Sequence, residues 1–181
     1  MRKGWFVYRD LSLFLLLPVI LIDQIGCGGV SSGHGSGTIP HVSHVLVLVE
    51  ENHSYGSVIG NPSMPYTNSL AQQYALATSY YANAHPSLLN YFMLTTGQTM
   101  AADDTFSGTV SADNVVRALT AAGKTWKAYA ESLPNSGYTA ATVYPYARDH
   151  NPFAYFNDVL KDSTQAENIV PFAQLATDAR N

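Results

Sequence analysis

Two short stretches of the chain combine residue types that could do hydrolytic chemistry. In residues 45–55, VLVLVEENHSY, an apolar run ends abruptly in two carboxylates and a carboxamide. In residues 85–97, HPSLLNYFMLTTG, a hydroxyl comes just before a helix-forming stretch. A buried strand that delivers polar side chains at its carboxyl end is a common entrance to an α/β active site. Together the two stretches predict a site with a divalent metal and a nucleophile.

Glu51 and Asn52 supply the oxygen donors of this prediction. A carboxylate beside a neutral oxygen donor suits a hard divalent cation such as Mg²⁺, Ca²⁺ or Mn²⁺, and Zn²⁺ stays open as well. The alternative is a turn in which Asn52 caps a helix, which is a common arrangement for this pair. His53 follows without metal-ligand spacing and is expected at the surface.

Ser87 is the candidate nucleophile, because the sequence predicts that it precedes a helix over residues 90–96. A nucleophilic oxygen works best where backbone N–H groups and the positive end of a helix meet the attacked phosphoryl oxygens. A metal can lower the pKa of the hydroxyl, so that no adjacent base is required. The alternative is that Ser87 merely caps the helix. Asn90 could donate to a phosphoryl oxygen or cap the loop.

The elements that must position these residues alternate between strand and helix. The apolar run over residues 44–49 predicts a strand buried on both faces of a parallel sheet. Further strands are predicted over residues 76–81 and 125–130, and helices over 68–74, 90–96, 112–122 and 170–178. This order predicts an α/β fold with a doubly wound parallel sheet and helices on both faces. Three strands are few for such a sheet, so we expect residues 41–181 to be the N-terminal part of a larger domain.

The N-terminal residues predict export. Basic residues precede an apolar run of about a dozen residues, which is typical of a signal peptide over residues 1–26 and short for a membrane span. Cys27 stands where bacterial lipoproteins carry their acylated cysteine, so lipidation at Cys27 with membrane anchoring and ordinary cleavage nearby both stay open. Residues 27–40 form a Gly/Ser-rich tether. We expect the protein to be exported, either to the periplasm, to the medium or to a membrane to which it is anchored as a lipoprotein.

Composition limits the partners. The formal net charge of −4, without a block of like charge, argues against nucleic acid as a partner. A single cysteine rules out an internal disulfide. The twelve tyrosines fit half-buried loop positions or an aromatic wall around a pocket, above all in the irregular residues 133–150. Composition leaves the oligomeric state open.

Four segments resemble one known family. VEENHSY looks like the metal-binding opening motif, and HPSLLNYFMLTTG like the nucleophile loop, of the bacterial and fungal phosphoesterase family. TWKAYAESLP and DHNPFAYF are similar to later segments of that family. The family contains acid phosphatases and phosphatidylcholine-type phospholipases C and is similar to the alkaline-phosphatase superfamily. The resemblance implies an alkaline-phosphatase-like fold and metal-assisted hydrolysis of phosphomonoesters or phosphodiesters through a covalent phospho-enzyme.

The resemblance also implies roles for single residues. Glu51 and Asn52 match the first metal-binding pair, and Ser87 matches the nucleophile. Asn90 matches the asparagine that contacts the phosphate, although a leucine replaces the proline usual before it. His150 matches a histidine that could protonate the leaving group or bind phosphate.

His85 is a further candidate for substrate binding, with a structural role as its alternative. Family members carry a second acidic metal pair and further histidines in their later half, and none follows His150 here. A metal held by the early ligands alone would lack oxygens, since hard cations want about six or more. We therefore expect this chain alone to be truncated and weakly active or inactive.

Two other functions compete with this hypothesis. A non-catalytic exported domain could keep the fold and bind phosphate or glycan through the tyrosine-rich residues 133–150. A sulfatase-like hydrolase would need a Cys/Ser-x-Pro-x-Arg motif, which the sequence lacks.

Overall fold

The structure is a computed structural model that describes residues 42–180. It divides into two units, which meet in sequence between Ala82 and Asn83, and each is described by itself. The predicted signal peptide, Cys27 and the tether lie outside the described residues. Within residues 42–180, no helix has the length and apolar character needed to cross a membrane.

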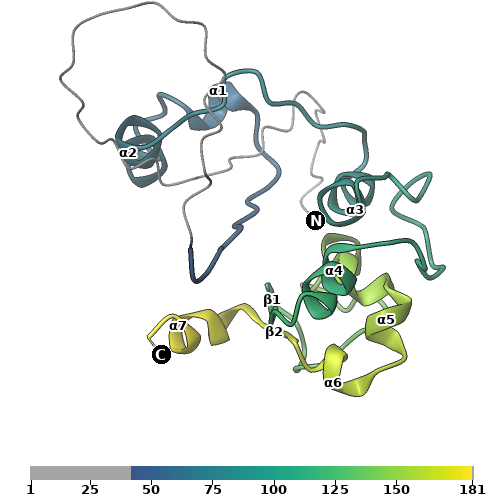
Figure 1. Cartoon of the computed structure of the whole chain (residues 1–181). Coiled ribbons are helices and arrows are strands. Elements are labelled where there is room, and N and C mark those ends of the chain that lie inside the picture. Colours follow the sequence, from purple (N-terminus) through teal and green to yellow (C-terminus); the bar gives the residue numbers. More distant parts are fainter. Residues whose placement is uncertain (1–41, 181) are drawn as a thin grey trace, which may run out of the picture. The chain divides into compact units, whose positions relative to one another are not determined.

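The first unit holds two helices, α1 (Tyr55–Val58) and α2 (Pro65–Gln73), drawn in blue and blue-green in Figure 1. The side chain of Asn68 in α2 ties the connection between them together. Its Nδ2 donates to the carbonyls of Met64 at 2.7 Å and Val58 at 2.9 Å, and its Oδ1 accepts from Gly60 N at 2.6 Å. These bonds join the end of α1 and the loop after it to α2.

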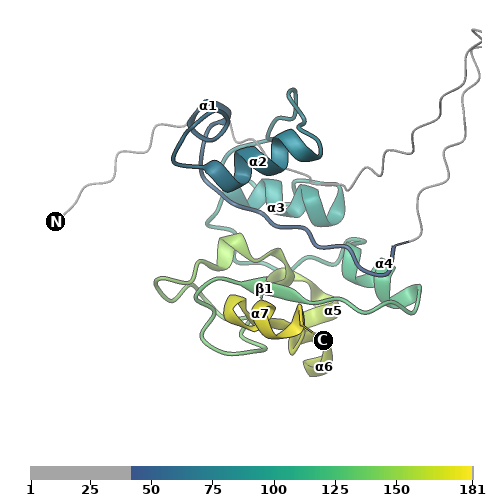
Figure 2. The same cartoon turned by 90° about the vertical axis from the view of Figure 1, so that its left-hand side faces the viewer.

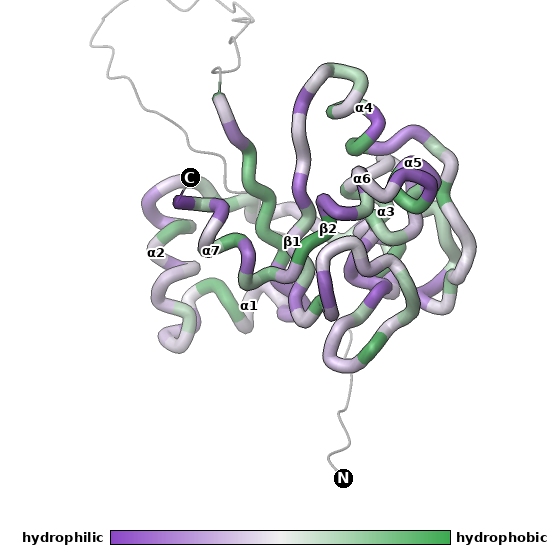
Figure 3. The backbone as a smooth tube through the Cα atoms, turned by 90° about the horizontal axis from the view of Figure 1, so that it is seen from below, coloured by the Kyte–Doolittle hydropathy of each residue, from purple (hydrophilic) through white to green (hydrophobic). Residues whose placement is uncertain are grey.

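The predicted strand over residues 44–49 is wrong. These residues are extended but unpaired, and the side chains from Val45 to Leu48 are between 74% and 50% exposed. They form the green, hydrophobic stretch of tube that follows the grey trace in Figure 3. A strand needs a neighbour for its backbone groups, and none of the described residues pairs with this run. The predicted strand over residues 76–81 is also absent. These residues lie in a turn and a loop.

The second unit is a mixed helix-and-strand structure around a small parallel sheet. Strand β1 (Ala128–Ala130) pairs with β2 (Ile169–Pro171) in parallel, with Ala128 opposite Ile169. The other elements of this unit are, in chain order, α3 (Ser87–Thr96), α4 (Val115–Ala121), η1 (Arg148–His150), η2 (Pro152–Tyr155), α5 (Asn157–Leu160), α6 (Ser163–Ala166), η3 (Phe172–Gln174) and α7 (Leu175–Asp178). Parallel strands need a crossover connection, and α5 and α6 lie within this one.

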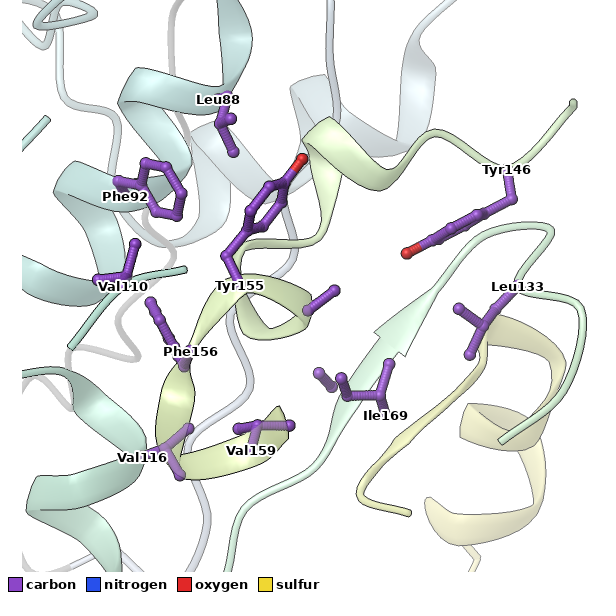
Figure 4. Close-up of a cluster of buried hydrophobic side chains, with 12 residues drawn as sticks. Leu88, Phe92, Val110, Val116, Leu133, Tyr146, Tyr155, Phe156, Val159 and Ile169 are labelled. Atoms are coloured by element: carbon purple, nitrogen blue, oxygen red, sulfur yellow. The ribbon is translucent and has the colours of Figure 1, made fainter. Parts of the chain in front are cut away.

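Phe92 of α3 lies at the centre of an aromatic core (Figure 4). Its ring meets those of Tyr155 and Phe106 edge-on, with centroids 5.4 and 5.9 Å apart. Leu88, one turn earlier in α3, is also fully buried. Each such side chain stabilises the fold by about 1.5–3 kcal/mol. The helix that begins at Ser87 is therefore anchored in the core through these two residues.

Polar bonds hold the outer elements onto this core. Asp178 of α7 accepts from Lys127 Nζ at 2.7 Å and from the Tyr129 hydroxyl at 2.9 Å, which fixes α7 beside β1 (Figure 2). A second polar contact joins α4 to α5, where Arg117 Nη2 lies 2.9 Å from both carboxylate oxygens of Asp158. The helix predicted over residues 170–178 is in fact β2, η3 and α7, because residues 169–171 pair with β1 instead.

Candidate active site

Ser87 is the first residue of α3 and is half-buried. The sequence predicted that the helix begins at Asn90, and the structure moves its start to Ser87. Pro86 occupies the preceding position in an extended conformation, with φ −84° and ψ −162°. The first residues of a helix have N–H groups without intrahelical partners, so Ser87 lies at the positive end of a ten-residue helix.

The side chain of Asn90 holds the loop that leads into Ser87. Its Oδ1 accepts from Asn83 N at 2.9 Å and from Ala84 N at 3.1 Å. Its Nδ2 donates to the carbonyls of Ala84 at 2.6 Å and Pro86 at 3.3 Å. Both ends of the amide are therefore engaged with backbone, as the loop-capping alternative for Asn90 requires.

His85 lies within the loop that Asn90 holds. The backbones of its two neighbours, Ala84 and Pro86, are both bonded to Asn90, while the His85 side chain is exposed. This arrangement fixes where the His85 side chain leaves the backbone. It puts an imidazole two residues before Ser87, on a loop of restricted conformation.

Asp104 contacts the start of α3 and was not singled out from the sequence. Its Oδ1 accepts from Leu88 N at 2.8 Å, across 16 residues of chain. One of the backbone N–H groups next to Ser87 is therefore taken by a protein carboxylate. The sequence contains no local pattern that tells which loop carboxylate returns to a helix.

His150 lies over the same helix. Its ring stacks on Tyr91 with centroids 5.6 Å apart and an interplanar angle of 29°. Tyr91 is four residues after Ser87, so both project from one face of α3. His150 therefore lies on the Ser87 side of the helix. Its side chain is 41% exposed, and its Nε2 is 3.7 Å from Asp149 Oδ2, too far for a hydrogen bond.

Arg148 adds a positive charge next to His150. Its guanidinium carbon lies 3.9 Å from the centroid of the Tyr155 ring, and its Nη2 donates to Ala154 O at 2.9 Å. Its Nε is buried and has no hydrogen-bond partner among the described residues. Burial raises the pKa of Tyr155, and the charge of Arg148 acts against that rise.

Glu51 and Asn52 belong to the first unit, whereas Ser87, Asn90, His85 and His150 belong to the second. Glu51 is half-buried and Asn52 exposed, and both lie just before α1. Their oxygens are the donor types that a hard cation prefers. Residues 42–180 hold no cluster of three or more His, Cys, Asp or Glu side chains suited to a metal. The donor chemistry fits a divalent cation, but two ligands do not complete its shell.

Comparison with known protein families assigns this chain to one of them. The model of the Phosphoesterase family matches residues 61–181, which is most of the chain. The chain belongs to the phosphoesterase family. The resemblance inferred from the four motif segments is thereby confirmed.

Relatives of this phosphoesterase chain are named as phosphatases. It is 35% identical to a phosphatidylinositol-3-phosphatase of Mycobacterium tuberculosis over 155 residues, 84% of this chain and 52% of that protein. It is 30% identical to a probable acid phosphatase of Kluyveromyces lactis over 75% of this chain and 34% of the relative. An acid phosphatase of Aspergillus fumigatus is also 30% identical, over 72% of this chain and 31% of the relative.

The phosphoesterase chain spans about half the length of the mycobacterial relative and about a third of the two fungal ones. No solved structure matches it significantly. The family match covers the second unit in full, with Ser87, Asn90, Asp104 and His150, and starts after Glu51 and Asn52.

Proposed function

We propose that the chain carries the nucleophile and proton-donor side of a phosphatase site that hydrolyses phosphomonoesters. The observation that supports this most directly is the first turn of α3. There, Ser87 begins a helix, its loop is held by Asn90, and His150 stacks on the same helix face. The family match and the three relatives named as phosphatases support the same chemistry.

In the proposed reaction, Ser87 Oγ attacks phosphorus and the bond between phosphorus and the ester oxygen breaks. Ser87 Oγ gives up its own proton to solvent in this attack, and the leaving alkoxide takes a proton from His150. His150 then takes a proton from water, and the water oxygen attacks the phosphoserine, which frees phosphate and Ser87. The His150 side chain is 41% exposed, so the leaving group of a substrate that enters from solvent can reach its imidazole. Glu51 and Asn52 would be two ligands of a divalent metal that needs further oxygens from elsewhere. When bound, such a metal lowers the pKa of a coordinated hydroxyl.

The test is hydrolysis of p-nitrophenyl phosphate with added Mg²⁺, Ca²⁺, Mn²⁺ or Zn²⁺, together with transfer of ³²P to the protein. We expect Ser87→Ala to lower turnover on the order of a thousandfold or more and to abolish the label. Ser107→Ala is the matched control, because Ser107 is an exposed loop serine. Turnover that survives Ser87→Ala would contradict the proposal. So would the absence of both turnover and label from this chain and from a longer form of it.

The small sheet is proposed to be part of a doubly wound parallel sheet of the alkaline-phosphatase type. Its support is the parallel pairing of β1 with β2 across a connection that contains helices. A structure of a longer form would test it, since further parallel strands must then pair with β1 or β2.

Export is proposed from the N-terminal sequence alone. Labelling of expressing cells with a radioactive fatty acid would distinguish lipidation at Cys27 from simple cleavage. Label that disappears in Cys27→Ala supports the lipoprotein, whereas an unlabelled protein in the medium supports cleavage.

A further inference from the structure

The carboxylate of Asp104 makes a long-range contact at the start of α3. Its Oδ1 lies 2.8 Å from the amide nitrogen of Leu88 and is part of a partly buried hydrogen bond. The chain reaches this point only after α3 has ended at Gly97 and the following loop has turned back. The adjacent Asp103 accepts from Thr105 N at 2.8 Å, which closes a turn directly around Asp104.

The bond acts on the peptide group that follows the proposed nucleophile. Leu88 N belongs to the planar peptide group that joins Ser87 to Leu88. The orientation of this peptide group sets the direction in which the Ser87 side chain leaves the backbone. Leu88 itself is fully buried, which anchors one side of this peptide in the core. Asn90 anchors the loop on the other side through Ala84 and Pro86. Asp104 is the third point that fixes the Ser87 backbone.

We propose that Asp104 is a positioning residue for the nucleophile: it holds the Ser87–Leu88 peptide and thereby the direction of Ser87 Oγ. This inference rests on the proposed function of Ser87. Small displacements of a reacting group lower turnover strongly, and truncating a helix-capping carboxylate frees an amide that has no intrahelical partner. The hydrogen bond carries the role and the charge only strengthens it, because a carboxamide oxygen also accepts from a backbone N–H.

Three variants test the proposal in the whole chain. Asp104→Ala removes the acceptor, and Asp104→Asn keeps the acceptor but removes the charge. Asp113→Ala removes the same charge from a side chain that is 97% exposed and bonded to Arg117. The measurements are hydrogen exchange at the Leu88 amide, and kcat and KM for p-nitrophenyl phosphate.

We expect Asp104→Ala to speed exchange at Leu88 by roughly tenfold, to lower kcat by roughly tenfold and to leave KM within about twofold. Asp104→Asn and Asp113→Ala should keep both exchange and kcat near wild-type values. Unchanged exchange in Asp104→Ala would overturn the proposal whatever the activity. Faster exchange with wild-type kcat would overturn the positioning role.

Failure of the proposed function would be visible separately. It would show as wild-type protein that neither turns over substrate nor takes the ³²P label on Ser87. Exchange at Leu88 would still decide in that case whether Asp104 holds the peptide.

Discussion

Asn90 is a residue whose chemistry serves the loop in this structure. The sequence predicted that it contacts phosphate, and that role stays a prediction. Its amide oxygen and nitrogen each bond to backbone of residues 83–86. Because its amide is occupied at both ends, we expect Asn90 to affect the proposed catalysis through the position of its neighbours, above all His85 and Ser87.

Replacing Asn90 by leucine should therefore lower both stability and activity. The substitution keeps the size of the side chain but removes its hydrogen bonds to two N–H groups and two carbonyls of the loop. We expect the free energy of unfolding to fall by about 2 kcal/mol, since water can satisfy part of these groups. Urea unfolding measures the loss. Asn135→Leu is the control, because the Asn135 side chain is exposed and donates only to the neighbouring Ser136 carbonyl. Equal losses of unfolding free energy in both variants would contradict the role of Asn90 in holding residues 83–86.

Sequence reasoning could find the candidates that carry chemistry in their own side chains. Ser87 and His150 stand in motif segments, and the stack of His150 on Tyr91 brings His150 to the helix of Ser87. Asp104 and Arg148 were missed, because their positions depend on contacts with other segments. No local pattern indicates that the Asp104 carboxylate returns to Leu88 or that Arg148 lies over Tyr155.

Helices α3 and α4 show what a sequence predicts of an element. The end of the helix predicted over residues 90–96 is confirmed, since Gly97 follows α3 in the left-handed conformation with φ 74°. The start of α4 was placed wrongly: the helix predicted over residues 112–122 has Ser111 as its N-cap, but α4 begins at Val115. Asn114 caps it instead, accepting from Arg117 N at 3.1 Å while its Nδ2 donates to Asp158. Both residues are good N-caps, and the tertiary contact with Asp158 decides between them.

The contact between α4 and α5 predicts a dependence of stability on acid. Burial raises the pKa of Asp158, but hydrogen bonds from Arg117 and Asn114 outweigh burial and hold the pKa below the ordinary value of an aspartate. A carboxyl with a depressed pKa in the folded state stabilises above its unfolded pKa and loses this contribution as pH falls further. We expect Asp158→Asn to lower the free energy of unfolding by about 1–2 kcal/mol at pH 7. The deficit should shrink below pH 4.

Urea unfolding between pH 7 and pH 3 measures this difference. The control is Asp113→Asn, since the Asp113 partner of Arg117 is 97% exposed and such surface pairs contribute about 0–1 kcal/mol. A deficit of Asp158→Asn that stays constant down to pH 3 would contradict the assignment of the pKa shift.

At the scale of the whole molecule, strands were harder to predict than helices. A helix satisfies its own backbone, whereas a strand exists only with a partner that lies elsewhere in the chain. The run over residues 44–49 has the composition of a buried strand and is unpaired in the structure. A helix was predicted to begin at residue 170, and the pairing of residues 169–171 with β1 makes them a strand instead. The doubly wound sheet therefore stays a prediction beyond the two strands described.

The unpaired apolar run predicts self-association of this chain. Exposed residues with high β-propensity and no charge offer unpaired backbone to a second chain. We expect Val45→Lys with Val47→Lys to lower the weight-average mass seen by sedimentation at high concentration. Val143→Lys with Tyr144→Lys is the control, because these residues are also exposed but lie in the second unit. A monomeric wild-type chain, or an equal effect of both pairs, would contradict the prediction.

The burial of Leu88 and Phe92 one and five residues after Ser87 has a consequence for how this molecule can evolve. Trimming an aromatic side chain such as Phe92 costs about 3–5 kcal/mol, a large part of the stability of an ordinary domain. Substitutions along α3 are therefore selected for folding before they can be selected for substrate range. The exposed loop residues 140–145 carry no such burden. New specificities should arise there, while the helix that bears the proposed nucleophile stays nearly constant.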